Sequence, residues 1–192
     1  MYWDYGETEP PSESGVQGYM RQHQLGLHEK IRDHVPRGKV LDYGGGTGCY
    51  TAPLKEHGYE VYLLDPDREA VGYGVKVFGV EGYVGYGAGS PWIDGFFDLV
   101  VMNQVIEHFI DPLLELMVCH MLLKQGGVLY LRTGATWANP DFGYDWEYAR
   151  PEERTFWSLP LLKRIAEEAG FNVLKMDIDE INGYNLEIWV RK

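Results

Sequence analysis

Four glycines follow a short apolar segment in the stretch Val40-Leu-Asp-Tyr-Gly-Gly-Gly-Thr-Gly48. Glycine tolerates the positive φ angles of a tight turn and lets a ligand approach the backbone closely. The residues after the glycines are predicted to form a helix, whose free N–H groups carry a partial positive charge. The stretch therefore predicts a loop that binds a nucleotide-like ligand at the carboxyl end of a strand. The dinucleotide spacing G-x-G-x-x-G is not met, because Cys49 stands in the third position of a pattern that begins at Gly44.

A second acidic residue, Asp65, ends the next apolar segment and is followed by Pro66. A carboxylate in this position can accept hydrogen bonds from both hydroxyl groups of a ribose. It can also cap the helix that follows, and the two roles are compatible.

A third candidate lies in the segment Phe97-Asp-Leu-Val-Val-Met-Asn-Gln-Val-Ile-Glu-His108. Its apolar half predicts a buried strand, so Asn103 and Gln104 are expected at the carboxyl end of that strand. Because an imidazole titrates near neutral pH, His108 is a candidate to take a proton from an acceptor hydroxyl. The alternative is that Glu107 and His108 only fix the loop through hydrogen bonds.

Strands alternate with helices along most of the chain, which predicts a parallel sheet with helices on both faces. The predicted strands are 39–43, 59–64, 82–86, 97–102, 128–133, 171–179 and 184–190, and the predicted helices are 18–34, 47–57, 67–77, 112–124 and 159–169. Asn182-Gly183 is a strong hairpin signal, so the last strand should run antiparallel. We therefore expect an α/β fold, a Rossmann-like three-layer α/β/α sandwich with a seven-stranded, mostly parallel sheet and an antiparallel C-terminal hairpin strand.

Composition limits the class of protein. The chain has 192 residues, two cysteines and a net charge of −12. This length predicts a single domain, with an N-terminal arm and cover helix over 1–35 and the main body over 36–192. Two cysteines exclude a disulfide framework, the N-terminus lacks a signal-peptide layout, and no apolar run approaches the ~20 residues of a membrane helix. We expect a cytoplasmic protein with no membrane partner, and the acidic charge disfavours a nucleic-acid partner.

These segments together resemble class I S-adenosylmethionine-dependent methyltransferases over about residues 38–190. The first motif of that family is an acid followed by glycines at alternate positions, as in Asp42 to Gly48. The Glu107-His108 pair after the fourth strand resembles the subgroup that includes ubiquinone-biosynthesis O-methyltransferases. The late segments 155–163 and 168–171 resemble that subgroup as well.

The resemblance implies S-adenosylmethionine as cofactor and S-adenosylhomocysteine as product. It implies a cofactor site made of Asp42, Tyr43, Gly44, Gly45, Gly46, Gly48, Asp65, Pro66, Tyr86, Asn103, Gln104 and Arg21. Tyr86 is a departure, because many members of the family carry there an Asp that contacts the adenine. The acceptor is expected to be covered by the aromatic segment that contains Trp137, Tyr144 and Trp146, although core packing is an equal alternative for these rings.

The function implied is transfer of a methyl group to a small-molecule acceptor, with a hydroxyl as the favoured target and His108 as the candidate base. Three alternatives stay open: a methyltransferase-like protein that only binds or regulates, a methyltransferase that acts on protein, and a nicotinamide oxidoreductase. The histidines lack the spacing of a zinc site, so no metal is expected. The sequence leaves the oligomeric state open.

Overall fold

The computed structural model describes residues 26–134, 154–178 and 185–192 of the chain. The chain divides into two compact units, Met1–Pro91 and Trp92–Lys192, which are described separately below. The predicted boundary between residues 35 and 36 stays a prediction.

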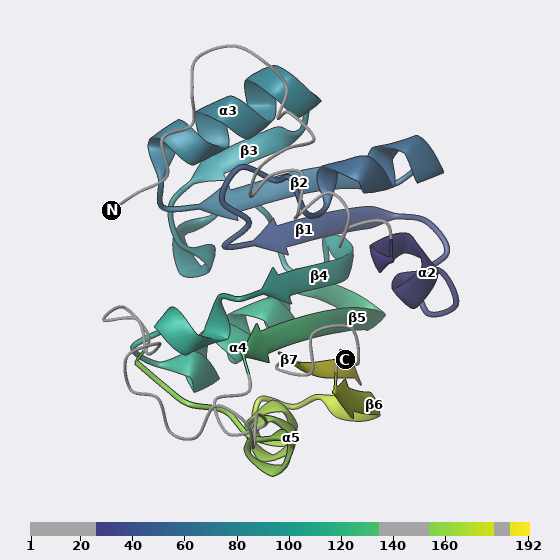
Figure 1. Cartoon of the computed structure of the whole chain (residues 1–192), viewed down its shortest axis with the longest axis vertical. Coiled ribbons are helices and arrows are strands. Elements are labelled where there is room, and N and C mark those ends of the chain that lie inside the picture. Colours follow the sequence, from purple (N-terminus) through teal and green to yellow (C-terminus); the bar gives the residue numbers. More distant parts are fainter. Residues whose placement is uncertain (1–25, 135–153, 179–184) are drawn as a thin grey trace, which may run out of the picture. The chain divides into compact units, whose positions relative to one another are not determined.

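The first unit contains three parallel strands and two helical connections. The strands β1 (Lys39–Tyr43), β2 (Glu60–Asp65) and β3 (Glu81–Val84) lie in the order β3-β2-β1. A 3₁₀ helix, η1 (Ala52–His57), connects β1 to β2, and α3 (Arg68–Phe78) connects β2 to β3. Figure 1 shows the three strands side by side, with α3 packed against β2 and β3.

Helix α3 forms as expected, although it contains two glycines. Asp67 caps its N-terminus by accepting hydrogen bonds from the backbone N–H groups of Glu69 and Ala70, and Gly79 ends it in the left-handed conformation. Gly74 has a packing role, because a Cβ atom there would lie 2.7 Å from the carbonyl oxygen of Thr47. The glycine that lowers the helix propensity thus lets α3 approach the loop after β1.

Two helix predictions in this unit need correction. The segment 47–57 was expected to be an α-helix, but only the 3₁₀ helix η1 forms within it. Gly48 takes a φ of +75°, and Pro53 near the start of η1 has no N–H to donate, so a regular α-helix cannot run through this segment. Of the predicted helix 18–34, the described part contains the short helix α2 (Leu27–Ile31), and residues 18–25 lie outside the described ranges.

The second unit contains four strands. The strands β4 (Phe97–Asn103), β5 (Leu123–Gly134), β6 (Asn172–Ile178) and β7 (Asn185–Arg191) lie in the order β4-β5-β7-β6. β4 and β5 are parallel, whereas β7 runs antiparallel to both of its neighbours. This confirms the antiparallel C-terminal hairpin strand, although the turn residues Asn182-Gly183 lie outside the described ranges.

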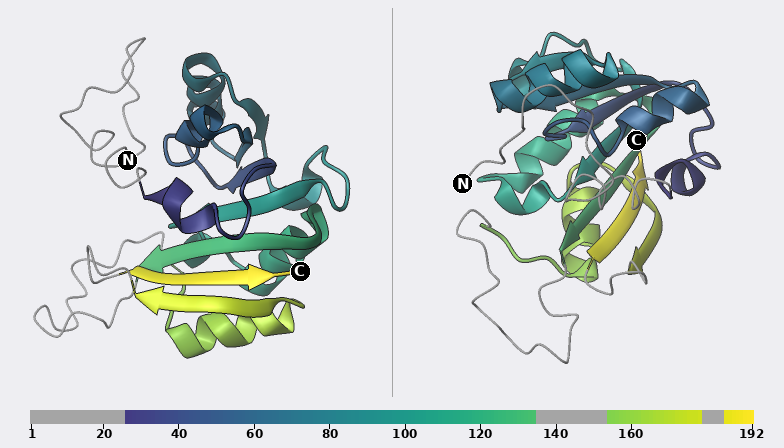
Figure 2. Two further views of the ribbon diagram at one scale, coloured as in Figure 1. Left: turned by 90° about the vertical axis from the view of Figure 1, so that its right-hand side faces the viewer. Right: turned by 45° about the horizontal axis from the view of Figure 1, so that its top comes forward.

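Two helices of this unit begin at the predicted caps. Asp111 accepts a hydrogen bond from the N–H of Leu114 at the start of α4 (Pro112–Leu122), and Ser158 accepts one from Leu161 at the start of α5 (Leu159–Glu168). Figure 2 shows α5 lying along β6 and β7. β5 starts at Leu123, earlier than predicted, and a break in its register with β4 before Val128 contains the expected turn glycines.

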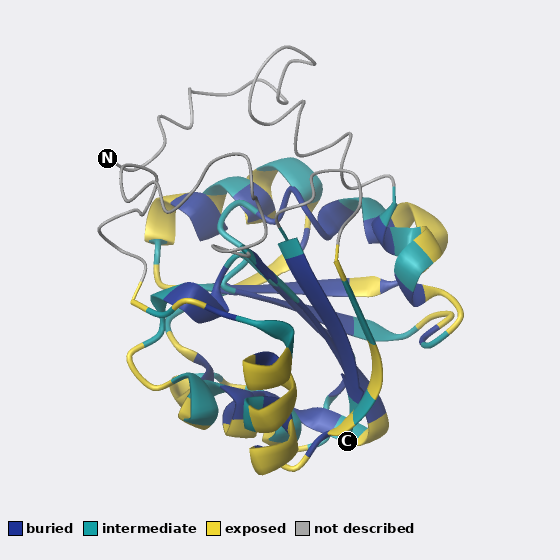
Figure 3. Cartoon of the chain, turned by 60° about the horizontal axis from the view of Figure 1, so that its bottom comes forward, coloured by how far each residue is buried: buried dark blue, intermediate teal, exposed yellow. Residues whose placement is uncertain are grey.

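The strands carry the core of each unit. Figure 3 shows the strands largely buried and the outer faces of the helices exposed. In the second unit the apolar side chains of β4, from Phe97 to Met102, are fully buried. Three parallel strands in one unit, and four strands in the other of which β7 alone runs in the opposite direction, confirm the predicted α/β class with seven strands. Among the described residues, the longest helices are too short or too polar to cross a lipid bilayer.

Candidate functional site

The loop after β1 depends on glycine at alternate positions. Gly44, Gly46 and Gly48 have φ angles of +70°, +56° and +75°, which side chains of L-residues rarely adopt. The N–H groups of Gly44 and Gly45 both donate to the carbonyl oxygen of Leu64 at the end of β2, at 2.7 and 3.2 Å. The loop is therefore hydrogen-bonded to the neighbouring strand, and each of its three positions with positive φ is a glycine, which has no Cβ atom.

Asp65 holds the same loop with its carboxylate. Its Oδ2 accepts a hydrogen bond from the N–H of Gly46 at 2.8 Å, and its Oδ1 accepts one from the N–H of Asp67 at 2.8 Å. Burial raises the pKa of Asp65, and the two N–H donors oppose that rise. A carboxylate offers about four acceptor sites, so these two bonds leave capacity for the two hydroxyl groups of a ribose. The half-buried Asp65 thus fits the role predicted for it.

Asp42 lies beneath the loop. It is only 1% exposed, and its Oδ2 accepts a hydrogen bond from the Thr51 hydroxyl at 2.6 Å. Burial raises the pKa of Asp42 to about 7, against the opposing effect of the Thr51 bond. A Cβ atom at Gly45 would overlap the Asp42 carboxyl group. The Asp42 carboxyl group thus packs directly against Gly45, and its predicted part in a cofactor site stays a prediction.

The turn after β3 is built from close contacts between glycines and tyrosines. The ring of the buried Tyr43 packs so closely on Gly87 that a Cβ atom there would overlap it. The Tyr83 hydroxyl donates to the carbonyl oxygen of Gly89 at 2.6 Å. Tyr86, which lies between Tyr83 and Gly87 in the sequence, is 64% exposed. Gly87 thus lets the backbone of this turn pack against the Tyr43 ring, whereas the Tyr86 side chain is exposed to solvent.

The turn after β4 contains a strained residue. Gln104 has a φ of +57° and is the one non-glycine with positive φ in the described ranges. Its N–H donates to the carbonyl oxygen of Arg132 at 2.8 Å, and its side-chain Nε2 donates to Asn185 Oδ1 at 2.6 Å. Such strain persists where surrounding contacts fix the residue, and it is frequent at functional sites.

A polar row crosses β4, β5 and β7 beside this turn. Asn103 pairs in register with Arg132, and Arg132 pairs with Glu187. The Arg132 side chain donates to Asn103 Oδ1 at 3.2 Å and lies 3.7 Å from the Glu187 carboxylate, which also accepts from the Tyr130 hydroxyl at 2.8 Å. A buried charged pair is tolerated only when its members are hydrogen-bonded, and here Arg132 bonds Asn103 while Glu187 accepts from Tyr130.

Three residues of this row and turn were not predicted from the sequence: Arg132, Asn185 and Glu187. The signal was present, because Arg132 and Glu187 are charged residues inside apolar strand segments. A charge that interrupts a buried strand calls for a partner or a ligand.

Glu107 fixes the segment that carries His108. Glu107 is buried, and its Oε2 accepts a hydrogen bond from the Thr133 hydroxyl at 2.9 Å. Its carbonyl oxygen accepts from the N–H groups of Arg154 and Thr155, at 2.7 and 3.3 Å. The loop-fixing role considered for the Glu107-His108 pair thus applies to Glu107. His108 is half-buried at the end of the 3₁₀ helix η3 (Ile106–His108), and its part in catalysis stays a prediction.

Several predicted site residues fall outside the described ranges. These are Arg21, Trp137, Tyr144 and Trp146. Within residues 26–134, 154–178 and 185–192, no group of three or more His, Cys, Asp or Glu side chains is arranged to hold a metal ion.

The family model and the curated relatives that match this chain are methyltransferases. The sequence matches the family model described as a methyltransferase domain over residues 17–176. It is 27% identical over 168 residues to a protein of Xanthomonas campestris pv. campestris strain B100 named ubiquinone biosynthesis O-methyltransferase, an alignment that covers 81% of this chain and 69% of that protein.

Solved structures show the same fold at low sequence identity. A SAM-dependent methyltransferase of Thermotoga maritima, described as a possible histamine N-methyltransferase, has a TM-score of 0.72 at 21% identity and is covered over 91% of each chain. A SAM-dependent methyltransferase of Archaeoglobus fulgidus has a TM-score of 0.75 at 18% identity, over 94% of this chain and 97% of that one. These likenesses confirm the Rossmann-like methyltransferase fold.

Proposed function

The chain belongs to the class I S-adenosylmethionine-dependent methyltransferases, and on that premise we propose that it methylates a hydroxyl group of a small-molecule acceptor. The family implies S-adenosylmethionine as the methyl donor. The hydroxyl is favoured because the curated relatives of the Xanthomonas group are named O-methyltransferases.

One observation carries the cofactor part of the proposal. The Asp65 carboxylate bonds the N–H of Gly46 and keeps free acceptor capacity beside a loop with three glycines at positive φ. Asp65 would accept hydrogen bonds from the ribose hydroxyls, and the glycines would let the ligand approach the loop backbone with no Cβ atom in the way. When bound, the cofactor supplies a methyl group made electrophilic by its sulfonium.

The remaining residues of the proposal act on the acceptor. His108 takes the hydroxyl proton on an imidazole nitrogen and releases it to solvent after the transfer. Glu107 keeps the turn that carries His108 in place through its bonds to Thr133 and Arg154. Positioning the acceptor oxygen in line with the methyl group and excluding water supply the rest of the rate enhancement.

The proposal is tested by calorimetric titration with S-adenosylmethionine and S-adenosylhomocysteine, with NAD as a control ligand. We expect micromolar binding of both S-adenosyl compounds, no NAD signal, and at least a tenfold loss of affinity in Asp65→Ala, equal to about 1.4 kcal/mol. Glu69→Gln is the matched control, because it removes a nearby exposed carboxylate without touching the loop. Binding of NAD, or unchanged affinity in Asp65→Ala, would contradict the proposed cofactor site.

A second step tests the acceptor. The protein is incubated with S-adenosylmethionine labelled in the methyl group and with catechols, simple phenols, sugars, small amines and an unfolded protein. Methylation of a phenol or catechol oxygen supports the proposal. Cofactor binding without transfer to any of these classes would favour the binding or regulatory alternative, and transfer to the unfolded protein would favour a protein substrate.

A further inference from the structure

Arg132 and Glu187 form a charged pair inside two largely apolar strands. The two residues are in register across β5 and β7, and their side chains are 12% and 4% exposed. A buried ion pair contributes little to folding, because the loss of its hydration offsets its Coulomb attraction, and an apolar pair of the same size is often as stable. The stability of the sheet therefore does not by itself account for this pair.

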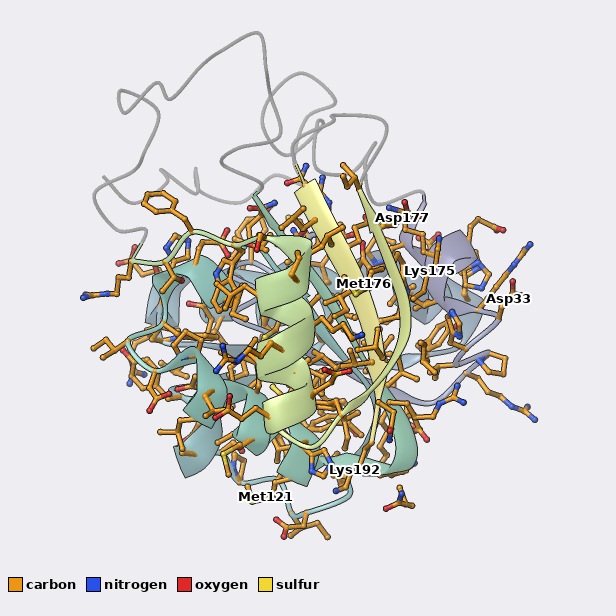
Figure 4. All side chains as sticks on the ribbon, turned by 90° about the horizontal axis from the view of Figure 1, so that it is seen from below. Asp33, Met121, Lys175, Met176, Asp177 and Lys192 are labelled. Carbon is orange, nitrogen blue, oxygen red and sulfur yellow. The ribbon has the colours of Figure 1, made fainter. Side chains whose placement is uncertain are left out.

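The acid beside this pair on β6 has a basic partner of its own. Asp177 is in register with Glu187, so their side chains share one face of the sheet. The Asp177 carboxylate pairs with Lys175 at 2.8 Å. Figure 4 shows Lys175 and Asp177 on one side of β6 and Met176 on the other side, toward α5. The charged pair thus lies on the face opposite to α5, and Asp177 does not compete with Glu187 for Arg132.

Arg132 holds the turn after β4 at two points. Its Nη1 donates to Asn103 Oδ1 at 3.2 Å, and its carbonyl oxygen accepts from the N–H of Gln104 at 2.8 Å. Glu187 Oε1 lies 3.7 Å from Arg132 Nε and also accepts from the Tyr130 hydroxyl at 2.8 Å. These contacts end on two consecutive residues, the last of β4 and the first of the turn.

Gln104 is a residue that needs such support. Its φ of +57° is unfavourable for a residue with a Cβ atom. A strained residue persists where its surroundings fix it, and residues of this kind are frequent at ligand sites. The carboxyl ends of parallel strands are also where open α/β sheets bind ligands. The buried charged pair and the strained residue are separate observations, and both indicate a function for this turn.

We propose that Arg132 is a positioning residue that holds this turn in the shape that binds the amino-acid end of S-adenosylmethionine. The inference rests on the proposed function, which supplies the ligand. Because a guanidinium only donates, Arg132 holds the Asn103 amide by its Oδ1 and turns the Nδ2 donor end away from itself. The half-buried Asn103 then donates from Nδ2 to the carboxylate of the ligand.

The amino-acid end is the part of the ligand that matches these groups. It carries a carboxylate and an ammonium, whereas the adenine and the ribose are uncharged. The ribose is already assigned to Asp65. An amide that donates to a carboxylate forms a charge-assisted hydrogen bond, which is roughly twice as strong as a neutral one. A correctly oriented Asn103 therefore contributes most where the ligand is charged.

The first experiment compares two ligands by calorimetry on the whole chain. S-adenosylhomocysteine carries the amino acid, and 5′-methylthioadenosine has the same nucleoside and sulfur without it. The double variant Arg132→Met with Glu187→Gln removes both charges and keeps an acceptor for the Tyr130 hydroxyl. It should lose about tenfold or more in affinity for S-adenosylhomocysteine and less than about twofold for 5′-methylthioadenosine. Lys175→Met with Asp177→Asn is the matched control, because it removes a neighbouring ion pair from the same face, and it should bind both ligands as the wild type does.

Thermal unfolding separates positioning from stability. The double variant should unfold within about 4 °C of the wild type, whereas a fall of more than about 10 °C would assign the pair to stability and overturn the proposal. Asn103→Ala interrupts the same contacts without a change in β5 or β7, and it should give the same selective loss.

The second experiment adds Gln104→Gly to the double variant. Glycine adopts a positive φ at little cost, so the turn needs less support from Arg132. The triple variant should therefore bind S-adenosylhomocysteine about threefold or more tightly than the double variant does. A triple variant that binds no better would overturn the proposal, because Arg132 would not act through the strained residue.

The ligand pair also distinguishes this inference from the proposed function. A wild type that binds neither ligand would contradict the proposed cofactor and the inference with it. A wild type that binds both ligands, with equal changes in the affinity of the double variant for the two, would overturn the inference alone.

Discussion

The loop after β1 and the turn after β4 each follow a strand that has a parallel neighbour, yet they hold positive φ angles by different means. The loop after β1 uses glycine at all three such positions, where the left-handed conformation carries little cost. The turn after β4 places Gln104 there and holds it with bonds to Arg132 and Asn185. The first device is local in sequence, whereas the second depends on residues brought from distant strands.

This difference suggests a division of labour. A loop of glycines is held by the neighbouring strand β2, through Leu64 and Asp65, which suits the binding of a cofactor common to a whole family. A turn held by β5 and β7 instead depends on residues of both strands, so that a substitution in either strand affects it. Five measurements test or sharpen this contrast.

The largest effect on activity is expected for His108→Ala. If the turn after β4 serves chemistry, removal of the imidazole should lower kcat by about 100-fold or more, because a general base contributes roughly 10² to 10⁴. The affinity for S-adenosylhomocysteine should change less than twofold, in contrast with Asp65→Ala. The check is steady-state kinetics with the first acceptor found, beside calorimetry. Equal turnover in variant and wild type would remove His108 from the mechanism.

Asp42→Asn should change how stability depends on pH. Burial raises the pKa of Asp42 from 3.8 to about 7 in the folded protein, so the folded state binds more protons than the unfolded state between those values. The stabilisation present below about pH 4 is lost as pH rises to about 7. At 1.36 kcal/mol per unit this loss is on the order of 4 kcal/mol.

Urea unfolding at several pH values tests this expectation. The wild type should lose stability between about pH 4 and pH 7, and Asp42→Asn should lose much less, with a remainder from the raised pKa of Asp65. Glu69→Gln, on the surface of α3, should keep the wild-type slope. If the unfolding free energy of Asp42→Asn depended on pH as that of the wild type does, ionisation of Asp42 would cost the folded protein little.

Gly45→Ala should destabilise the protein by about 3 kcal/mol, because the new Cβ atom would overlap the Asp42 carboxyl group. Gly72→Ala is the control, since a Cβ atom there meets nothing within 4 Å inside α3, and it should stabilise by about 0.5–1 kcal/mol. Thermal unfolding compares the two. A loop that accepts alanine at position 45 would not be as tightly supported as we describe.

Thr133→Val should cost about 2 kcal/mol, because it removes the hydroxyl that donates to the buried Glu107 carboxylate. Thr133→Ser keeps the donor and should recover most of the loss. Chemical unfolding of both variants measures the difference. Equal stability of the valine and serine variants would mean that Thr133 contributes by shape alone.

The smallest effect separates two substitutions at Gln104. Gln104→Ala loses the bond to Asn185 and keeps the backbone strain, so it should destabilise by about 1 kcal/mol. Gln104→Gly loses the same bond but relieves the strain, so it should be about 1 kcal/mol more stable than the alanine variant. Unfolding free energies of the two give the strain directly, and an alanine variant as stable as the glycine variant would exclude it.

The sequence predicts the first of the two regions better than the second. The strand, the glycines and Asp65 lie within one contiguous stretch, so their types and order are enough to indicate the loop. The contacts of Gln104 and Glu107 come from residues as far along the chain as Asn185, and no local pattern ties these together. The error at 47–57 has a local cause, because Gly48 with its positive φ and Pro53 near the start of η1 together prevent a regular α-helix.

The bonds of Glu107 also bear on how such an enzyme diversifies. Thr133 precedes the segment 135–153 and Arg154 follows it, and both are fastened to this one residue. The positions of Thr133 and Arg154 are thus fixed by Glu107 and do not depend on which residues connect them. Doubling the length of a connecting segment costs only about 0.6 kcal/mol of closure entropy. The segment between Thr133 and Arg154 can therefore be replaced by one of different length and composition while the rest of the unit keeps its fold.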